Sequence, residues 1–127
     1  MFKTWNSQRE GSYRNATGNG VLERMNRTVM ERARCMRLHA RFPLQFWTDV
    51  VDTSVYLINI RPSSSLDGAI PKEAWTGKKV NYSCLKTFGC EAFVHINKEN
   101  RTKLEEKSKK CIFIGYGVND FGYRLYD

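Results

Sequence analysis

Residues 19–41, NGVLERMNRTVMERARCMRLHAR, combine two patterns that decide the fold of this part of the chain. Apolar residues recur at steps of three and four, which is the spacing of one face of an α-helix. They are Leu22, Met25, Val29, Ala33, Met36 and Ala40. Six arginines against Glu23 and Glu31 give residues 21–41 a local charge of +4, and five of the six fall on the remaining arc of the helix. The segment therefore predicts an amphipathic helix with an arginine face.

The flanking segments set the limits of this helix. Residues 1–18 are polar and show no period, so they are predicted to form a loose N-terminal arm. Pro43 ends the helix and suits the first turn of a second helix that reaches about Ile60. A further helical turn is predicted at residues 71–75, where Gly77 is placed to terminate it.

Towards its C-terminal end the sequence changes to the period of β-strands. Short alternating or β-rich runs occur at residues 91–96, 110–116 and 123–127, and they predict an antiparallel meander. The stretch between the first two runs carries charges of both signs and is predicted to be a solvated hairpin loop. The expected fold class is therefore α+β, with helices over residues 19–78 and a small β module over residues 79–127.

The composition leaves two classes of function open. The net charge of 21 − 13 = +8 and the pI near 9.5 suit a polyanionic partner or simply keep a protein soluble. No long apolar run and no secretory signal appear, so no membrane partner is expected. The four cysteines lack the short spacing of zinc ligands, and His39 and His95 have no third ligand in sequence reach, so no metal is assigned to them.

Beyond these patterns, residues 19–28 read N-G-V-L-E-R-M-N-R-T. This segment matches N-G-x-x-E-R-x-N-R-T of the integrase of copia-type retrotransposon Pol polyproteins, which the chain resembles. Further blocks follow in the family's order at residues 46–51, 56–62, 71–78, 88–90, 107–116 and 122–127. The resemblance implies the helical remnant of an RNase H-like core, followed by an SH3-like β module that is incomplete at its C-terminus. Residues 15–18 depart from the family, which carries a Pro-Gln-Gln type run there.

The resemblance also implies a role for Glu23, because the family uses this glutamate as the last member of a catalytic Asp, Asp, Glu triad. Such carboxylates hold two divalent ions, Mg²⁺ in the complete family enzyme, around the scissile phosphate. No aspartate precedes Asp49 in this sequence. Glu23 is therefore expected to be a vestigial catalytic residue and a metal ligand only in a complete core, so this chain alone is expected to hold no cofactor and to be no enzyme. The alternative is a surface acid paired with Arg27 one helical turn away.

The main functional hypothesis is a truncated, integrase-derived fragment that binds DNA. Arginines on one helix face can contact phosphates with little dependence on sequence, whereas the alternative is a solvated surface. The resemblance implies that this helix runs beside bound DNA. The candidate nucleic-acid-binding residues are Arg24, Asn26, Arg27, Arg34, Arg37 and Arg41. A protein that follows the family would act inside the cell, in the nucleus.

Two other functional hypotheses remain open. An exposed apolar helix face suits an interaction protein that self-associates or binds intact integrase, and a relic without a selected function is compatible with a single sequence.

Aromatic residues also have two interpretations. Phe46 and Trp47 are predicted to pack between the helices. The aromatic residues of the β module could pack in its core or line a groove that holds a strand or a peptide, and core packing is favoured. They are Tyr116, Phe121, Tyr123 and Tyr126.

Overall fold

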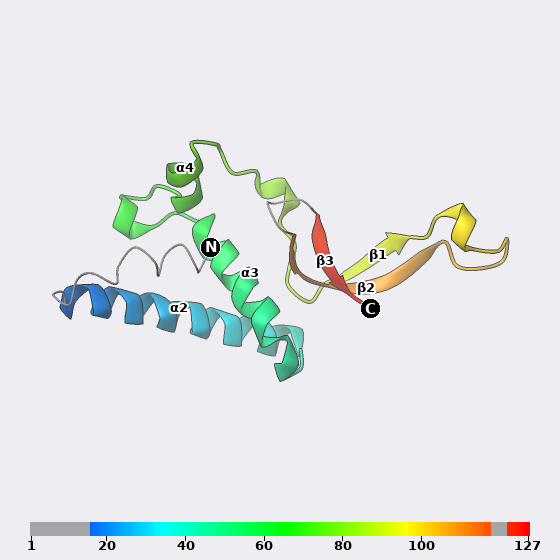
Figure 1. Ribbon diagram of the computed structural model, residues 1–127, viewed down its shortest axis with the longest axis horizontal. Coiled ribbons are helices and arrows are strands. Elements are labelled where there is room, and N and C mark those ends of the chain that lie inside the picture. Colours follow the sequence, from blue (N-terminus) through cyan, green and yellow to red (C-terminus); the bar gives the residue numbers. More distant parts are fainter. Residues whose placement is uncertain (1–15, 118–121) are drawn as a thin grey trace.

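The computed structural model describes residues 16–117 and 122–127 of the chain. Its helices are α2 (Ala16–Ala40), α3 (Trp47–Asn59) and α4 (Pro71–Thr76), and its strands are β1 (Glu91–His95), β2 (Ser108–Tyr116) and β3 (Tyr123–Tyr126). The helices lie at one end of an elongated molecule and the sheet at the other (Figure 1). The predicted α+β class is thus confirmed. Within the described ranges, no helix combines the length and the apolar character needed to cross a membrane.

Helix α2 begins at Ala16, earlier than the predicted start at residue 19. Residues 16–18 therefore belong to the helix and not to the predicted arm, and the rest of that arm, residues 1–15, lies outside the described residues. Gly18 and Gly20 lie in the first turns, where each costs about 1 kcal/mol relative to alanine. Because helix propagation is cooperative, the long run of good helix formers that follows offsets this cost.

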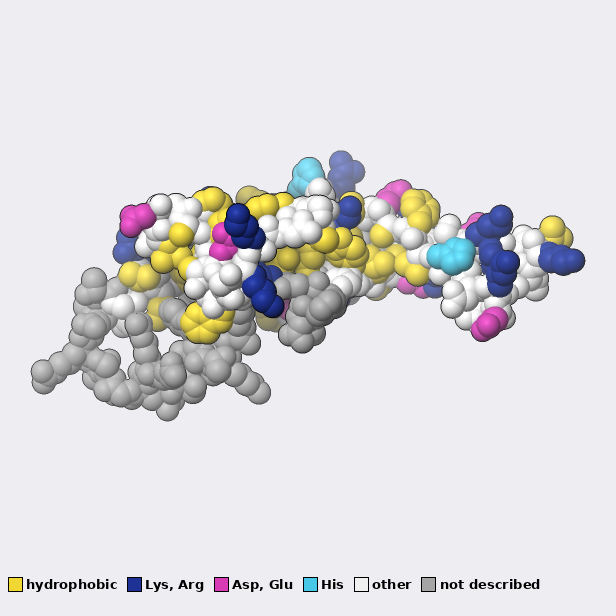
Figure 2. Space-filling view, turned by 90° about the horizontal axis from the view of Figure 1, so that it is seen from above, with side chains coloured by type: hydrophobic (Ala, Val, Ile, Leu, Met, Phe, Trp, Pro, Cys, Tyr) yellow, Lys and Arg dark blue, Asp and Glu magenta, His cyan; other side chains and the backbone are white. Residues whose placement is uncertain are grey.

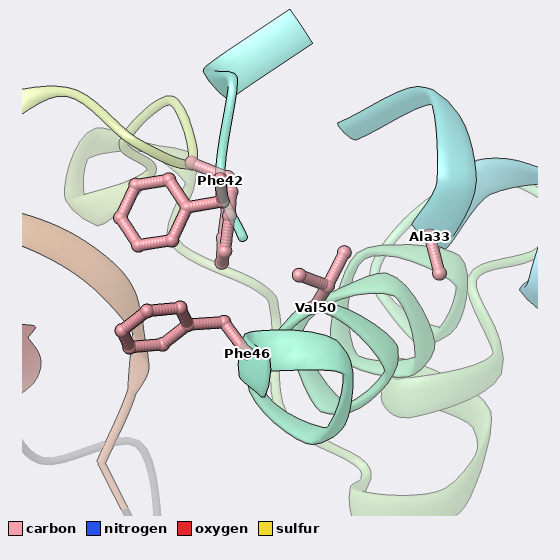
Figure 3. Packing of buried hydrophobic residues seen from close by; sticks show 5 residues of the cluster. Ala33, Phe42, Phe46 and Val50 are labelled. Atoms are coloured by element: carbon pink, nitrogen blue, oxygen red, sulfur yellow. The ribbon is translucent and has the colours of Figure 1, made fainter. Parts of the chain in front are cut away.

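The connection between α2 and α3 turns two phenylalanine rings into the core. Pro43 is the N-cap of a 3-10 turn, η1 (Leu44–Phe46), so α3 begins at Trp47 and not at the predicted Pro43. The rings of Phe42 and Phe46 meet edge to face with centroids 4.8 Å apart (Figure 3). The ring of Phe88 also meets that of Phe42, with centroids 5.4 Å apart. This cluster holds the turn in place.

Helices α2 and α3 cross where a small residue meets a larger one. Figure 3 shows Val50 of α3 near Ala33 of α2, and both side chains are buried. Burying a valine side chain contributes about 1.5–3 kcal/mol. Ser54 of α3 is fully buried and donates its hydroxyl to the backbone carbonyl of Val29 at 3.2 Å, so a polar contact also joins the helices. The amino-terminal part of α2 extends past this crossing (Figure 1).

The sheet is an antiparallel meander in the order β1-β2-β3, as predicted. Strand β2 begins at Ser108, slightly earlier than predicted, and the solvated loop before it contains a 3-10 turn, η4 (Lys98–Asn100). Phe113 in the middle of β2 is 1% exposed. The predicted helical turn after Ile70 is also present as α4, and it ends at Gly77 in the left-handed conformation.

Strand β2 packs against α3 at a glycine. A Cβ atom on Gly115 would lie 3.0 Å from Oγ1 of Thr53 and 2.9 Å from Nη2 of Arg124. Gly115 has a φ of +154°, and the β2–β3 register shifts between Phe113 and Gly115. The missing side chain lets α3 and the arginine approach the sheet backbone, which joins the helical part of the molecule to the β module.

Candidate nucleic-acid interface

Arg27 and Arg34 are two exposed residues of the predicted arginine face. They lie seven residues apart on α2, which is about 10.5 Å along the helix axis and about 20° around it. Both side chains are exposed, and neither makes a hydrogen bond or ion pair with another residue of the described ranges. Two guanidinium groups presented in this way form a positively charged strip that suits phosphate oxygens.

Arg24 and Asn26 lie on opposite flanks of this strip, and both are exposed. The Nε of Arg24 donates to the backbone carbonyl of Gly20 at 3.3 Å, which holds the side chain along the helix. Its terminal nitrogens stay at the surface. The structure therefore brings Arg24, Asn26, Arg27 and Arg34 together on one broad exposed surface of α2.

The end of α2 removes two candidates from this surface. The N–H of Phe42 donates to the carbonyl of Arg37 at 3.0 Å and the N–H of Arg41 to the carbonyl of Leu38 at 3.1 Å, which is a Schellman motif. Arg41 adopts a left-handed φ of 55° and so leaves the helix. The half-buried Arg37 donates from Nη1 to the carbonyl of Phe42 at 2.9 Å. The predicted continuous arginine face is therefore wrong at its C-terminal end.

Glu23 is exposed and is the eighth residue of α2. The predicted pairing with Arg27 is not formed, since no ion pair among the described residues includes either side chain. Nor does the described part of the chain contain a group of three His, Cys, Asp or Glu side chains placed to hold a metal ion. A pair of divalent ions needs several carboxylate oxygens, so Glu23 alone does not fit such a site and no catalytic step is assigned to it.

Tyr116 is the centre of an aromatic cluster between the helices and the sheet. Its ring stacks on that of Tyr56 with centroids 4.2 Å apart. Its hydroxyl accepts from the N–H of Lys86 at 3.1 Å and lies 3.3 Å from the carbonyl of the same residue. Burial raises the pKa of Tyr116, whereas the hydrogen bond to the Lys86 backbone lowers it. Tyr116 thus has a packing role, while Phe121 lies outside the described residues.

The other aromatic predictions have mixed outcomes. Phe46 is buried and meets the ring of Tyr126 at 4.8 Å, which joins η1 to strand β3. Tyr123 donates its hydroxyl to the carbonyl of Cys84 at 2.9 Å. Trp47, however, is 59% exposed, so its predicted packing between the helices is wrong. It is the first residue of α3, and a shared apolar arc does not ensure burial at a helix end.

Sequence reasoning missed the ion pairs of Arg124. This residue of β3 lies 3.2 Å from Asp49 and 3.8 Å from Asp52, both in α3. The only local signal is the three-residue spacing of the two aspartates, which places them on one helix face.

The sequence interpretation of α2 also did not include Met30 and Leu38. Both are exposed apolar residues that lie among the arginines of the helix. The surface of α2 is thus not purely charged.

Basic side chains also occur far from α2. Figure 2 shows Lys and Arg side chains at the end formed by the β1–β2 hairpin loop, and hydrophobic side chains gathered over the middle of the molecule. In that loop, residues 97–107 carry four basic and three acidic side chains, a net of +1. Residues 21–41 carry +4, so α2 is the stronger candidate for binding a polyanion.

Comparisons with known proteins agree with the observed fold. Residues 90–127 match the model of the retroviral polymerase SH3-like domain. The retrovirus-related Pol polyprotein from transposon TNT 1-94 of Nicotiana tabacum is 57% identical over 109 residues, which cover 86% of this chain and 8% of the relative. The corresponding polyprotein from transposon RE2 of Arabidopsis thaliana is 37% identical over 105 residues, 83% of this chain and 7% of the relative.

A shorter relative is similar over most of its own length. The uncharacterized mitochondrial protein AtMg00710 of Arabidopsis thaliana is 36% identical over 86 residues, which cover 68% of this chain and 69% of that protein. No solved structure matches. The chain spans less than a tenth of the Pol polyproteins that it matches. The resemblance noted in the sequence is confirmed, and the chain belongs to the family of retrovirus-related Pol polyproteins of transposons, from which it carries a segment that includes the SH3-like domain.

Proposed function

We propose that this segment is the part of a retrotransposon integrase that holds DNA through the exposed arginines of α2. The observation that carries the proposal is the pair Arg27 and Arg34, which lie two turns apart on one exposed face without a partner among the described residues. Guanidinium groups form strong, charge-assisted hydrogen bonds with phosphate oxygens. Arg24 and Asn26 on the flanks extend the contact to neighbouring phosphates or sugars.

Contacts of this kind give affinity without much sequence preference. Each phosphate that an arginine neutralises releases a condensed counterion, so two to three contacts give a slope of about −2 to −3 for log K against log salt concentration. Arg37 and Arg41 contribute less to the slope, because the guanidinium of Arg37 already donates to the carbonyl of Phe42 and Arg41 lies past the end of α2.

The helices themselves are proposed to be the helical part of an RNase H-like core. Val21 and Met25 of α2 are half exposed beyond the crossing with α3, and such apolar side chains are suited to cover a sheet layer. In a core of that kind, Glu23 would supply one of three carboxylates. The chain itself has no aspartate before Asp49, which supports the proposal that these 127 residues do not cut or join DNA alone. Any nicked or joined product formed by the purified chain with Mg²⁺ or Mn²⁺ would overturn this part.

The DNA contact is tested by fluorescence anisotropy with a labelled random-sequence duplex between about 50 and 200 mM salt. Over this range the affinity that phosphate contacts provide falls steeply. The double variant Arg27→Glu, Arg34→Glu is expected to lose at least about tenfold in affinity and to show a shallower salt slope. The matched control is Lys98→Glu, Lys103→Glu in the hairpin loop, which lowers the net charge by the same four units. Equal losses in the two variants would show that only net charge matters and would overturn the assignment to α2.

A further inference from the structure

Strand β1 forms an edge of the sheet. In the order β1-β2-β3, one side of β1 faces β2 and the other side faces no strand of the described residues. Figure 1 shows the β1–β2 hairpin extending away from the helices. An unpaired edge exposes backbone N–H and C=O groups that can template another strand, unless charge, proline or a bulge prevents it.

Two hydrogen bonds show which backbone groups of β1 point outward. The N–H of Ile96 donates to the carbonyl of Lys107 at 2.9 Å, and the N–H of Phe113 donates to the carbonyl of Cys90 at 2.9 Å. Both pairs continue the register of β1 and β2. Hydrogen-bonded and non-hydrogen-bonded pairs alternate along an antiparallel ladder. Even-numbered residues from 90 to 96 therefore bond to β2.

The odd-numbered residues Glu91, Phe93 and His95 consequently turn their N–H and C=O groups to the open edge. No other described segment donates to these groups or accepts from them. Their side chains share one face of the sheet, because side chains alternate along a strand. All three are exposed, and Phe93 is the most prominent apolar residue of the strand at 66% exposure.

We propose that two copies of the chain pair through β1, antiparallel and centred on Phe93, so that two three-stranded sheets become one of six strands. The sequence Glu-Ala-Phe-Val-His is complementary to itself in this register. Phe93 lies opposite its own copy, and Glu91 lies opposite the second copy's His95 at both ends. On the other face, Ala92 lies opposite Val94, so apolar residues meet there as well.

Charge complementarity selects this occupant over an unrelated strand. Opposite charges across strands stabilise a pair and like charges destabilise it. In the proposed register each Glu91 carboxylate meets an imidazole, whose N–H suits a carboxylate acceptor, and no two like charges face each other. Glu91 also forms an ion pair with Lys110 of β2, which holds the carboxylate on the face shared with Phe93 and His95. A shift by one residue would lose both Glu–His pairs and the central aromatic pair.

The proposed interface between two β1 strands is small, so the affinity of the two copies for each other is expected to be low. Each copy carries a net charge of +8, and salt screens this mutual repulsion. Self-association through β1 is therefore expected to strengthen with salt, whereas DNA binding through α2 weakens. The two proposals use different elements and fail independently.

The test is sedimentation equilibrium of the full chain at about 0.3 M salt over concentrations up to about 1 mM, a range that reveals weak complexes. The mass of the wild-type chain should rise from 14.8 kDa toward twice that value. Phe93→Pro should remain a monomer, because the N–H of residue 93 faces outward and proline removes no bond to β2. Circular dichroism shows whether that variant keeps the wild-type fold.

A second pair of variants tests the register independently of proline. His95→Glu places two acids opposite each other and should abolish dimer formation. The exchange Glu91→His with His95→Glu restores the complementarity with the residues reversed and should restore the dimer. A wild-type chain that stays monomeric throughout, or a dimer that survives both Phe93→Pro and His95→Glu, would overturn the proposal. The second result would point to the exposed apolar residues of α2 as the interface.

Discussion

The guanidinium of Arg124, in the last strand of the sheet, lies 3.2 Å from Oδ1 of Asp49 in helix α3. This ion pair joins the SH3-like module to the helical part at the point where Gly115 leaves space for it. The Nε of Arg124 is buried and has no hydrogen-bond partner. The positive charge of Arg124 is therefore compensated by the carboxylates of Asp49 and Asp52. Together with the ring contacts Phe46–Tyr126 and Tyr56–Tyr116, this contact sets the relative position of the two parts.

Replacing Arg124 with methionine is expected to lower the free energy of unfolding by about 1 kcal/mol, which is the upper end for a partly exposed ion pair. The side chains are 39% and 25% exposed, so solvent screens part of the attraction. A double-mutant cycle with Asp49→Asn, measured by urea denaturation, isolates the coupling between the two residues. Asp52→Asn is the control, because Asp52 is farther away and more exposed. Absence of coupling in the Asp49 cycle would contradict the role given to the pair.

Gly89 allows the segment after α4 to pass close to the end of α2. A Cβ atom on Gly89 would lie 2.5 Å from that of Ala40, and the φ of Gly89 is +82°. Gly89→Ala is therefore expected to destabilise the chain by about 2–4 kcal/mol, through both backbone strain and overpacking. Gly77→Ala is the matched control, since Gly77 has a φ of +68° but open space around it, and only the strain of about 1–2 kcal/mol applies. Equal losses in urea denaturation would show that the close contact with Ala40 is unimportant.

Arg41 holds a left-handed conformation that usually belongs to glycine at the end of a helix. Arg41→Gly should therefore raise the free energy of unfolding by about 0.5–1 kcal/mol, because the relief of strain exceeds the added entropy of the unfolded chain. Arg41→Ala keeps the strain and should show no gain. Both variants remove the same charge, so any effect of Arg41 on DNA affinity should be equal in the two. Stabilisation by alanine as well would contradict the explanation from strain.

The local parts of this fold could be predicted from the sequence, because local patterns determine them. The three-and-four spacing from Leu22 to Ala40 predicted α2, and the positions of Pro71 and Gly77 predicted α4. Alternation predicted the three strands and their antiparallel order. The start of α2 was placed too late because residues 1–18 show no apolar period, whereas cooperative propagation extends the helix through Gly20 and Gly18 to Ala16.

The tertiary part of the candidate site could not be predicted in this way. Helical spacing placed Arg37 and Arg41 on the arginine face, but the burial of Phe42 among Phe46 and Phe88 ends the helix first. The side chain of Arg37 then donates to the carbonyl of Phe42 beyond the helix end. These outcomes depend on contacts between residues far apart in sequence, about which a periodic pattern carries no information.

Tyr116 provides a prediction about pH. Burial raises its pKa above the ordinary value of 10.0, so the folded chain favours the neutral phenol. The contribution of Tyr116 to stability is therefore complete below about pH 10 and is lost as the pH rises through the raised pKa. Tyr116→Phe should cost about 1 kcal/mol near pH 7, because the hydrogen bonds to Lys86 are lost. The difference from the wild-type chain should then shrink as the pH rises above the ordinary value of 10.0 and through the raised pKa of Tyr116. Urea denaturation across this range provides the measurement, and a constant difference would show that Tyr116 does not couple ionisation to folding.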